Sequence, residues 1–346
     1  MSPSSAVQLM ATPNFSVMNT LYLMDPRWRP LVYPEDVDRE LRQSLTFVSP
    51  PQSATSIQEQ PERLRDVEVI FTGWGMARLD SALLTAAPRL RAVFHAAGTI
   101  RYFATPEMWS RGIVVCTANQ INAIPVAEYT LAAILFSLRH GWQHASAARC
   151  LGRFDPDQSM PGGYRSTVAL ISLGAVGRLV RERLRPFDVH VIAYDPFCSE
   201  EMARELDLEQ VTLEEAFARG DVVSLHTPLL PETEGLIRGG HLSAMKPRAT
   251  LINTARGGII REDELISVLQ QRPDLHAVLD VTDPEPPVAG SPLYQLPNVV
   301  LTPHIAGTCA AETPRMGRAM VEEYQRWRHG LPLRYAVSEE AAARQA

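Results

Sequence analysis

Three charged side chains come directly after short apolar runs in the last third of the chain. Arg256 follows the run 251–253, Glu285 follows 277–281, and His304 follows 299–301. Arginine offers a planar fork of donors that suits a carboxylate. Histidine changes charge near neutral pH and exchanges protons as an acid or base, and a glutamate beside it stabilises the charged form. The three residue types together indicate proton transfer on a small substrate that carries a carboxylate.

Each of these residues alone also has an ordinary structural explanation. A strand-end arginine often forms a surface ion pair, a loop glutamate is often only solvated, and a histidine after a proline often caps a turn. Their common placement favours a functional role, because ligands of parallel α/β sheets bind at the carboxyl ends of the strands. Asp283 is an alternative to Glu285 as the acidic partner of His304.

The segment 168–196 predicts a strand–turn–helix–strand unit of the kind that binds a dinucleotide. An apolar run at 168–171 is typical of a buried strand, and a turn, a helix at 176–184 and a second strand at 189–194 follow it. Gly174 lets the backbone approach a pyrophosphate, and Gly177 lets the helix pack closely on the strand. The free N–H groups at the helix start attract phosphate. Alternatively, the glycine turn serves only to let the helical connection pack closely on the strands, without binding a nucleotide.

Asp195, at the end of the second strand, argues for the nucleotide. Its carboxylate can accept hydrogen bonds from a ribose diol, and its charge repels a 2′-phosphate, which favours NAD over NADP. The lead position of the usual glycine triplet is Ser172. This substitution puts the geometry of the phosphate loop in question more than the identity of the cofactor.

Strands and helices alternate along most of the chain, which predicts an α/β protein. A strong helix is expected at 126–138, and six short strands from residue 168 onward predict a doubly wound sheet. A helix at 312–327 places Met316, Met320 and Tyr324 on one face and is expected to return to the first domain. We therefore expect a discontinuous substrate domain of residues 1–140 and 308–346, with a nucleotide domain of residues 141–307 inserted between its parts.

Composition narrows the class of protein. The 346 residues are 45% hydrophobic and 21% charged, and the net charge of −6 argues against a nucleic-acid or anionic-membrane surface. The four cysteines form no CxxC pair, so we expect reduced thiols in a cytoplasmic protein and no metal site. The longest apolar run is too short to span a bilayer, and no secretory signal is evident.

Over roughly residues 20–335 the sequence resembles the D-isomer-specific 2-hydroxyacid dehydrogenases. The matching segments are NAIPVAE (122–128), LGAVG with YDP (173–196), HTPLLPETEGLI (226–237), INTARGGII (252–260), LDVTDPEP (279–286) and LTPHIAGT (301–308). The resemblance implies two domains with Rossmann-like and flavodoxin-like doubly wound parallel sheets. It also implies an NAD-dependent oxidoreductase that reversibly converts a 2-keto acid into a D-2-hydroxy acid.

The resemblance assigns further roles. It implies Arg256 as substrate anchor, His304 as general acid/base with Glu285 as its partner, and the backbone of Ala97 and Gly98 as a carboxylate site. The motif and the resemblance together place the following residues at the cofactor: Leu173, Gly174, Ala175, Val176, Gly177, Asp195, His226, Thr227, Pro228, Thr254, Ala255, Asp280 and Gly307. The helix from Val126 is expected in a homodimer interface.

Departures from the family pattern leave alternatives open. Ile100 and Arg101 stand where an acidic residue and asparagine are common, so the keto acid is not identified, and Trp74 is expected either at the substrate or at a core edge. Glu285 in place of glutamine argues against the formate dehydrogenase branch. A nucleotide-sensing corepressor-like protein and a phosphite-type oxidoreductase remain alternative functions, because corepressors on this fold can keep the same three charged residues.

Overall fold

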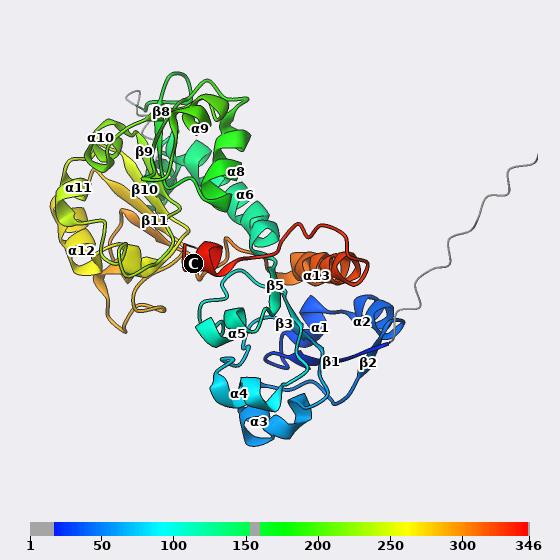
Figure 1. Ribbon diagram of the computed structural model, residues 1–346. Coiled ribbons are helices and arrows are strands. Elements are labelled where there is room, and N and C mark those ends of the chain that lie inside the picture. The colour runs from blue at the N-terminus through cyan, green and yellow to red at the C-terminus, as the bar shows by residue number, and fades with distance from the viewer. Residues whose placement is uncertain (1–16, 153–159, 345–346) are drawn as a thin grey trace, which may run out of the picture. The chain divides into compact units, whose positions relative to one another are not determined.

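A computed structural model of the protein describes residues 17–152 and 160–344, with the side chains of residues 150 and 151 left aside (Figure 1). The parts of the predicted domain ranges that fall on residues 1–16, 153–159 and 345–346 lie outside the described residues. Contacts divide the chain into two compact units. Unit 1 contains the described residues of Met1–Ala96, Phe103–Cys116 and Gly317–Ala336, and unit 2 those of Ala97–Tyr102, Thr117–Met316 and Val337–Ala346.

Unit 1 is built on a five-stranded sheet in the order β2-β1-β3-β4-β5, the flavodoxin-like order. Its strands are β1 (Met18–Leu23), β2 (Leu45–Phe47), β3 (Val69–Thr72), β4 (Ala92–His95) and β5 (Val114–Thr117). Its helices are α1 (Arg29–Val32), α2 (Glu35–Arg42), α3 (Ala54–Glu59), η1 (Pro61–Leu64), α4 (Ser81–Ala86) and α5 (Pro106–Ser110). The register is parallel, with Leu21 opposite Ile70 and Ile70 opposite Val93.

The helix α13 (Thr313–Arg328) carries the chain back into unit 1. Met316, Met320 and Tyr324, which recur every four residues, are all fully buried, as the helical spacing predicts. The ring of Tyr324 packs edge-on against Phe71 and Phe94 at centroid distances of 5.6 and 5.9 Å. Burial of this aromatic cluster ties the late helix to strands formed much earlier in the chain.

Unit 2 is built on a seven-stranded parallel sheet in the order β12-β11-β10-β9-β6-β7-β8. Its strands are β6 (Thr167–Ile171), β7 (His190–Tyr194), β8 (Glu209–Gln210), β9 (Val222–Leu225), β10 (Thr250–Asn253), β11 (His276–Leu279) and β12 (Val299–Leu301). Its helices are α6 (Asn119–Ser137), α7 (Gly141–Leu151), α8 (Ala175–Leu184), α9 (Glu200–Glu205), α10 (Leu213–Arg219), α11 (Gly239–Ser243), η2 (Gly257–Ile259), α12 (Glu262–Gln271), η3 (Pro292–Tyr294), η4 (Ala310–Glu312) and α14 (Glu339–Ala343).

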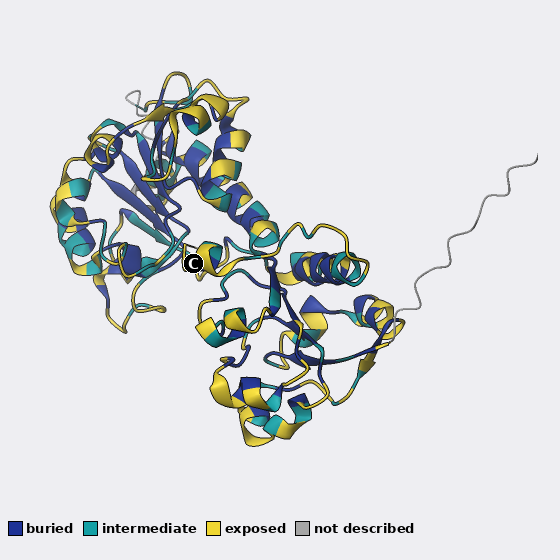
Figure 2. Ribbon diagram, in the orientation of Figure 1, coloured by how far each residue is buried: buried dark blue, intermediate teal, exposed yellow. Residues whose placement is uncertain are grey.

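Apart from the edge strands β8 and β12, the strands of this sheet are mostly dark blue, and the helices around it turn exposed faces outward (Figure 2). The strand order reverses between β6 and β9, because the chain leaves β6 in one direction along the sheet and returns to its other side at β9. Such a reversal opens a crevice at the carboxyl ends of the two strands. The fold therefore provides a ligand position between the ends of β6 and β9.

Three local differences separate the structure from the sequence expectations. The helix expected at 126–138 begins at Asn119, so Pro125 lies inside it. The polar residues before the proline lack a helical pattern of apolar residues, so the sequence does not indicate these first turns. The sheet has a seventh strand, the exposed two-residue β8, which is too short and polar to give a strand pattern. Because α6 packs on α8, residues 117–140 cluster with unit 2, whereas the sequence boundary was placed after residue 140.

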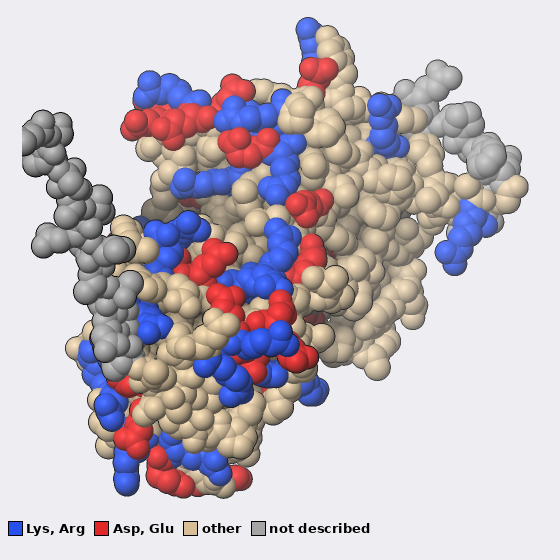
Figure 3. Space-filling view, turned by 90° about the vertical axis from the view of Figure 1, so that its right-hand side faces the viewer, with Lys and Arg blue, Asp and Glu red and all other residues tan. Residues whose placement is uncertain are grey.

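Among the described residues, no single helix is long and apolar enough to cross a membrane. The pair α6 and α7, bent by 66° at its break, passes that test on length and composition only. On the face shown in Figure 3, acidic and basic side chains are interspersed, and no large area carries one sign of charge.

Candidate active site

The turn after β6 has the backbone that a phosphate loop requires. Ser172 adopts a positive φ of 79°, a conformation that favours glycine, at the position where the motif usually has its first glycine. The Ser172 hydroxyl lies 2.9 Å from that of Thr227, which follows β9. This hydrogen bond links the ends of β6 and β9 and accompanies the unfavourable backbone conformation of a non-glycine residue.

Gly174 and Gly177 behave as the motif predicts. A Cβ on Gly177 would stand 2.2 Å from the carbonyl oxygen of Ser172, so only glycine allows α8 to pack this closely. A Cβ on Gly174 would meet no described atom within 4 Å, and no side chain caps α8. The first amides of the helix are therefore available to a ligand, and the helix dipole favours an anion there.

Asp195 stands at the end of β7. One carboxylate oxygen accepts from the Leu173 amide at 2.6 Å and the other from the Phe197 amide at 2.7 Å. These bonds fix the carboxylate beside the phosphate loop, and each oxygen keeps a lone pair for a ribose hydroxyl.

His226 follows β9 and is buried. Neither ring nitrogen has a hydrogen-bond partner among the described residues, and burial lowers the pKa of His226 to about 3. It lines a pocket of about 150 Å³ together with Gly174, Ala175 and Val176. A buried polar group without a partner in such a pocket is satisfied when a polar ligand binds.

Gly98 lines the same pocket from the loop after β4. The Thr117 hydroxyl lies 2.8 Å from the carbonyl oxygens of both Ala97 and Gly98 and holds this loop. Asn122, in the first turn of α6, accepts from the Thr308 amide at 2.9 Å, and Gly307 packs against the same side chain. The loop after β4 and the loop after β12 thus meet at α6.

Arg256 follows β10 and also lines the pocket. Burial lowers the pKa of Arg256, and the negative charge of Glu285 opposes that shift. Its neighbour Gly257 is required by a close approach, since a Cβ there would stand 2.0 Å from the carbonyl group of Thr282. The chain after β10 therefore passes tightly against the chain after β11, which brings Arg256 toward Glu285.

His304 and Glu285 form a pair. His304 Nδ1 lies 2.6 Å from Glu285 Oε1, which leaves Nε2 free to exchange a proton with a substrate. Asp283, the alternative partner, instead donates its amide to Glu262, a carboxyl group whose pKa is raised, first by burial and then by the charge of Asp283. The geometry selects Glu285.

Asp280 anchors the loop that carries His304. Its carboxylate accepts from the Thr302 hydroxyl at 2.6 Å and from the amides of Ile305 and Ala306 at 2.9 Å each. His304 has a positive φ of 54°, a conformation that costs energy for a non-glycine residue and often occurs at functional sites. Asp280, Glu285 and His304 border a second pocket of about 510 Å³.

The structure gathers ten of the expected residues around the first pocket: Gly98, Gly174, Ala175, Val176, His226, Thr227, Pro228, Thr254, Ala255 and Arg256. Asn119, Asn122 and Arg344 line it as well, and sequence reasoning missed them. For the two asparagines, the NAIPVAE segment was a usable signal, because it begins at Asn122. Arg344 had no signal in the sequence.

Ile100 is buried, and Arg101 donates to the Leu229 carbonyl at 3.2 Å. Trp74 belongs to unit 1, where its ring packs against that of Trp28 at 5.1 Å. Within the described residues, no group of three or more histidine, cysteine or acidic side chains could hold a metal ion.

The glycine turn, the open start of α8, the ribose-facing acid and the unpartnered His226 fit a dinucleotide. A Rossmann-type sheet with this loop defines the class of NAD-binding α/β proteins. Residues 131–306 match the family model described as "D-isomer specific 2-hydroxyacid dehydrogenase, NAD binding domain". The chain belongs to the D-isomer-specific 2-hydroxyacid dehydrogenase family, and it contains that family's NAD-binding domain.

Individual relatives agree with this assignment. The chain is 33% identical over 262 residues to a D-3-phosphoglycerate dehydrogenase of Archaeoglobus fulgidus, covering 75% of this chain and 50% of the relative. The chain thus spans about half the length of the curated relatives it matches. The TT0316 protein of Thermus thermophilus, whose crystal structure is known, shares 28% sequence identity with this chain. The two structures superpose with a TM-score of 0.72 over 92% of this chain and 100% of that one.

A D-mandelate dehydrogenase structure from Rhodotorula graminis shares the fold, with a TM-score of 0.78 at 24% identity, over 93% of this chain and 98% of that one.

Proposed function

We propose that the protein catalyses the reversible, NAD-dependent reduction of a 2-keto acid to a D-2-hydroxy acid. The observation that carries the proposal is the pair of His304 Nδ1 and Glu285 Oε1 at 2.6 Å, held at the carboxyl edge of the sheet that also bears Arg256 and the phosphate loop. A proton-exchanging group, a carboxylate anchor and a dinucleotide loop on one sheet edge are the parts that this reaction needs.

Arg256 binds the substrate carboxylate and orients the carbonyl, and the backbone at Ala97 and Gly98 provides further donors for the carboxylate. When bound, the nicotinamide supplies the hydride chemistry at C2 of the substrate. His304 gives a proton from Nε2 to the C2 oxygen during reduction and takes it back during oxidation. Glu285 accepts from Nδ1, which fixes the orientation of the ring.

Asp195 supports a preference for NADH over NADPH, because its carboxylate and a 2′-phosphate would occupy the same small region. We expect a much higher kcat/KM with NADH. Equal values for the two cofactors in the native protein would contradict this role for Asp195.

The substrate is tested with a panel of 2-keto acids followed by loss of NADH absorbance. The panel contains glyoxylate, hydroxypyruvate, pyruvate, phenylpyruvate and longer chains, together with the keto acid derived from 3-phosphoglycerate, which the names of several relatives indicate. Turnover of one or more of these acids supports the proposal. NADH binding without turnover of any of them would instead favour the nucleotide-sensing alternative.

The domain organisation and the assembly belong to the same proposal. We propose that unit 1, which lies within the expected ranges 1–140 and 308–346, forms the substrate domain, that the protein is a homodimer, and that it works in the cytoplasm. The described cysteines Cys116, Cys198 and Cys309 are free thiols, which suits a reducing compartment. Light scattering coupled to size-exclusion chromatography measures the mass, and a monomer would contradict the dimer.

A further inference from the structure

Arg344 lies at the dinucleotide pocket, although it is far from the phosphate loop in sequence. It follows the short helix α14, whose start is capped by Ser338 through a 3.1 Å bond from the Ala341 amide. This segment, from Val337 onward, belongs to unit 2, and Arg344 lines the same pocket as Gly174. The late segment therefore contributes a side chain to a pocket otherwise lined by residues 98–256.

Two contacts position the Arg344 guanidinium. Its central carbon lies 5.3 Å from the centroid of the Phe197 ring, within the range of a cation–π contact. Its Nη2 donates to Glu340 at 2.8 Å, which is its only hydrogen bond in the described part of the chain. A guanidinium carries five N–H donors, so most of them are available to an anion.

The pocket is electrostatically suited to an anion. The charged side chains among its described lining residues are Arg256 and Arg344, both positive, and no carboxylate lines it. The uncapped start of α8 adds free amides and the positive end of a helix dipole. Arg256 is assigned to the substrate carboxylate, whereas Arg344 has no partner in the reaction described above.

We propose that Arg344 binds the pyrophosphate of the dinucleotide together with the amides of α8, and that residues 337–344 complete the cofactor site. This inference rests on the proposed dinucleotide-dependent function. Two other anions are less suitable. A 2′-phosphate would lie beside the carboxylate of Asp195, which borders a different pocket rich in acidic residues. The substrate carboxylate already has Arg256 and Gly98.

The test compares Arg344→Gln with the native protein by calorimetric titration of ADP, adenosine, NADH and NADPH. ADP contains the pyrophosphate without the nicotinamide, and adenosine lacks it. We expect Arg344→Gln to weaken ADP and NADH about tenfold, the order of one charge-assisted hydrogen-bonded contact, and to leave adenosine unchanged. Arg344→Lys, which keeps the charge but not the fork, is expected to recover part of the loss.

Arg204→Gln is the matched control, since Arg204 is an exposed arginine on nearby α9 that does not line the pocket. It should leave every dissociation constant unchanged. Unchanged ADP affinity in Arg344→Gln would overturn the inference. Tighter ADP binding would overturn it as well, because it would show that the Arg344 side chain blocks the pocket. A loss of affinity confined to NADPH would show that Arg344 binds the 2′-phosphate instead. A raised KM for the keto acid alone would show that it binds the substrate carboxylate. Either result would overturn the inference.

Failure of this inference can be separated from failure of the proposed function. Native protein that binds ADP but reduces no keto acid would refute the dehydrogenase activity, while the ADP ratio between native protein and Arg344→Gln would still decide the role of Arg344. Native protein that binds neither ADP nor NADH would refute both.

Discussion

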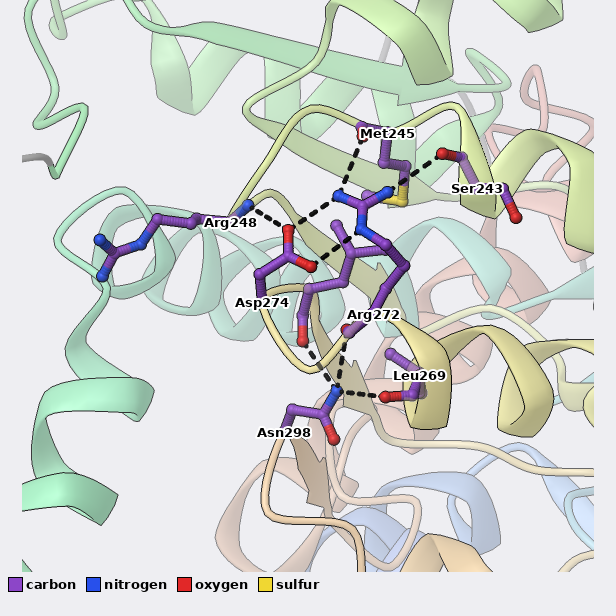
Figure 4. A network of polar contacts seen from close by, with 8 residues as sticks. Ser243, Met245, Arg248, Leu269, Arg272, Asp274 and Asn298 are labelled. Carbon is purple, nitrogen blue, oxygen red and sulfur yellow. Dashed lines mark hydrogen bonds and ion pairs between the residues drawn. The ribbon is translucent and has the colours of Figure 1, made fainter.

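A polar network at one edge of the unit 2 sheet and a pocket at the other edge use polar side chains in opposite ways. At the amino ends of β10, β11 and β12, Arg272, Asp274 and Asn298 form a closed network (Figure 4). Asp274 accepts from Arg272 and from the Arg248 amide, and Arg272 also donates to the carbonyls of Ser243 and Met245. The side chains of Arg272, Asp274 and Asn298 therefore all have hydrogen-bond partners within the protein.

At the carboxyl ends of the strands, polar groups remain available. His226 has two buried nitrogens without a described partner, the start of α8 is uncapped, and His304 keeps Nε2 free. Positive φ values occur at both edges, in Ser172 and His304 here and in Arg248 at the amino edge. The difference teaches that the network of Arg272, Asp274 and Asn298 satisfies its own polar groups, whereas the carboxyl edge places groups without a described partner around a pocket, where a ligand can satisfy them.

The largest expected effect is on activity and comes from the carboxyl edge. His304→Gln removes the proton-exchanging group but keeps a polar side chain of moderate size. We expect kcat/KM for keto-acid reduction to fall by about 10² to 10⁴, the usual contribution of a general acid. The dissociation constant of NADH and the melting temperature should stay close to native values. A variant that keeps most of its activity would remove His304 from the mechanism.

The next effect is on stability at low pH. The pKa of His226 is about 3 in the folded protein, against 6.5 for an ordinary histidine. Between these values the unfolded chain binds a proton that the folded protein excludes, so this contribution to stability is complete above about pH 6.5 and is lost as the pH falls toward 3. The full loss is roughly 3–5 kcal/mol.

His226→Asn removes this titration and should flatten the dependence of the unfolding free energy on pH in that window. Urea unfolding at a series of pH values measures the slope. An unchanged slope in His226→Asn would show that this histidine is not held neutral by the fold.

At the amino edge we expect a loss of stability without a loss of binding. Asn298 is buried, and its amide donates to the carbonyls of Leu269 and Leu275 at 3.0 Å each. Asn298→Ala leaves these carbonyls without that donor and should cost about 2 kcal/mol. Exposed Gln271→Ala should cost less than about 0.5 kcal/mol. A change in ADP affinity in Asn298→Ala would contradict the separation of the two edges.

The smallest expected effect is a partial loss of turnover. Glu285→Gln replaces the carboxylate that lies 2.6 Å from His304 Nδ1 with an amide of nearly the same shape. An uncharged acceptor makes a weaker hydrogen bond than a carboxylate, so the ring is held less firmly and kcat should fall about tenfold, less than in His304→Gln. Reduction and oxidation, each measured at one fixed pH, should fall by similar factors.

Asp283→Asn is the matched control for Glu285→Gln and should leave both rates close to native. If Asp283→Asn lowers the rates and Glu285→Gln does not, the pairing seen in the structure is not the one used in catalysis.

Much of the fold could be predicted because its signals are local. The strand at 168–171, the helix after it and the acid at Asp195 are neighbours in sequence, and the structure places them as β6, α8 and the end of β7. The start of α6 could not be predicted, because Pro125 lies inside a helix whose first turns have no apolar period. The edge strand β8 likewise depends on pairing with β7, which a two-residue polar segment does not signal.

The sequence by itself determined the family, the α/β alternation and the residue types at the site, because strand-end positions and glycine spacing are set by short-range chemistry. Only the tertiary structure decided that Glu285, and not Asp283, contacts His304, because both acids follow the same strand and the path of the loop sets which carboxylate reaches the ring. It also decided that Arg344 shares a pocket with Gly174, because that contact joins residues distant in sequence and no local pattern encodes it.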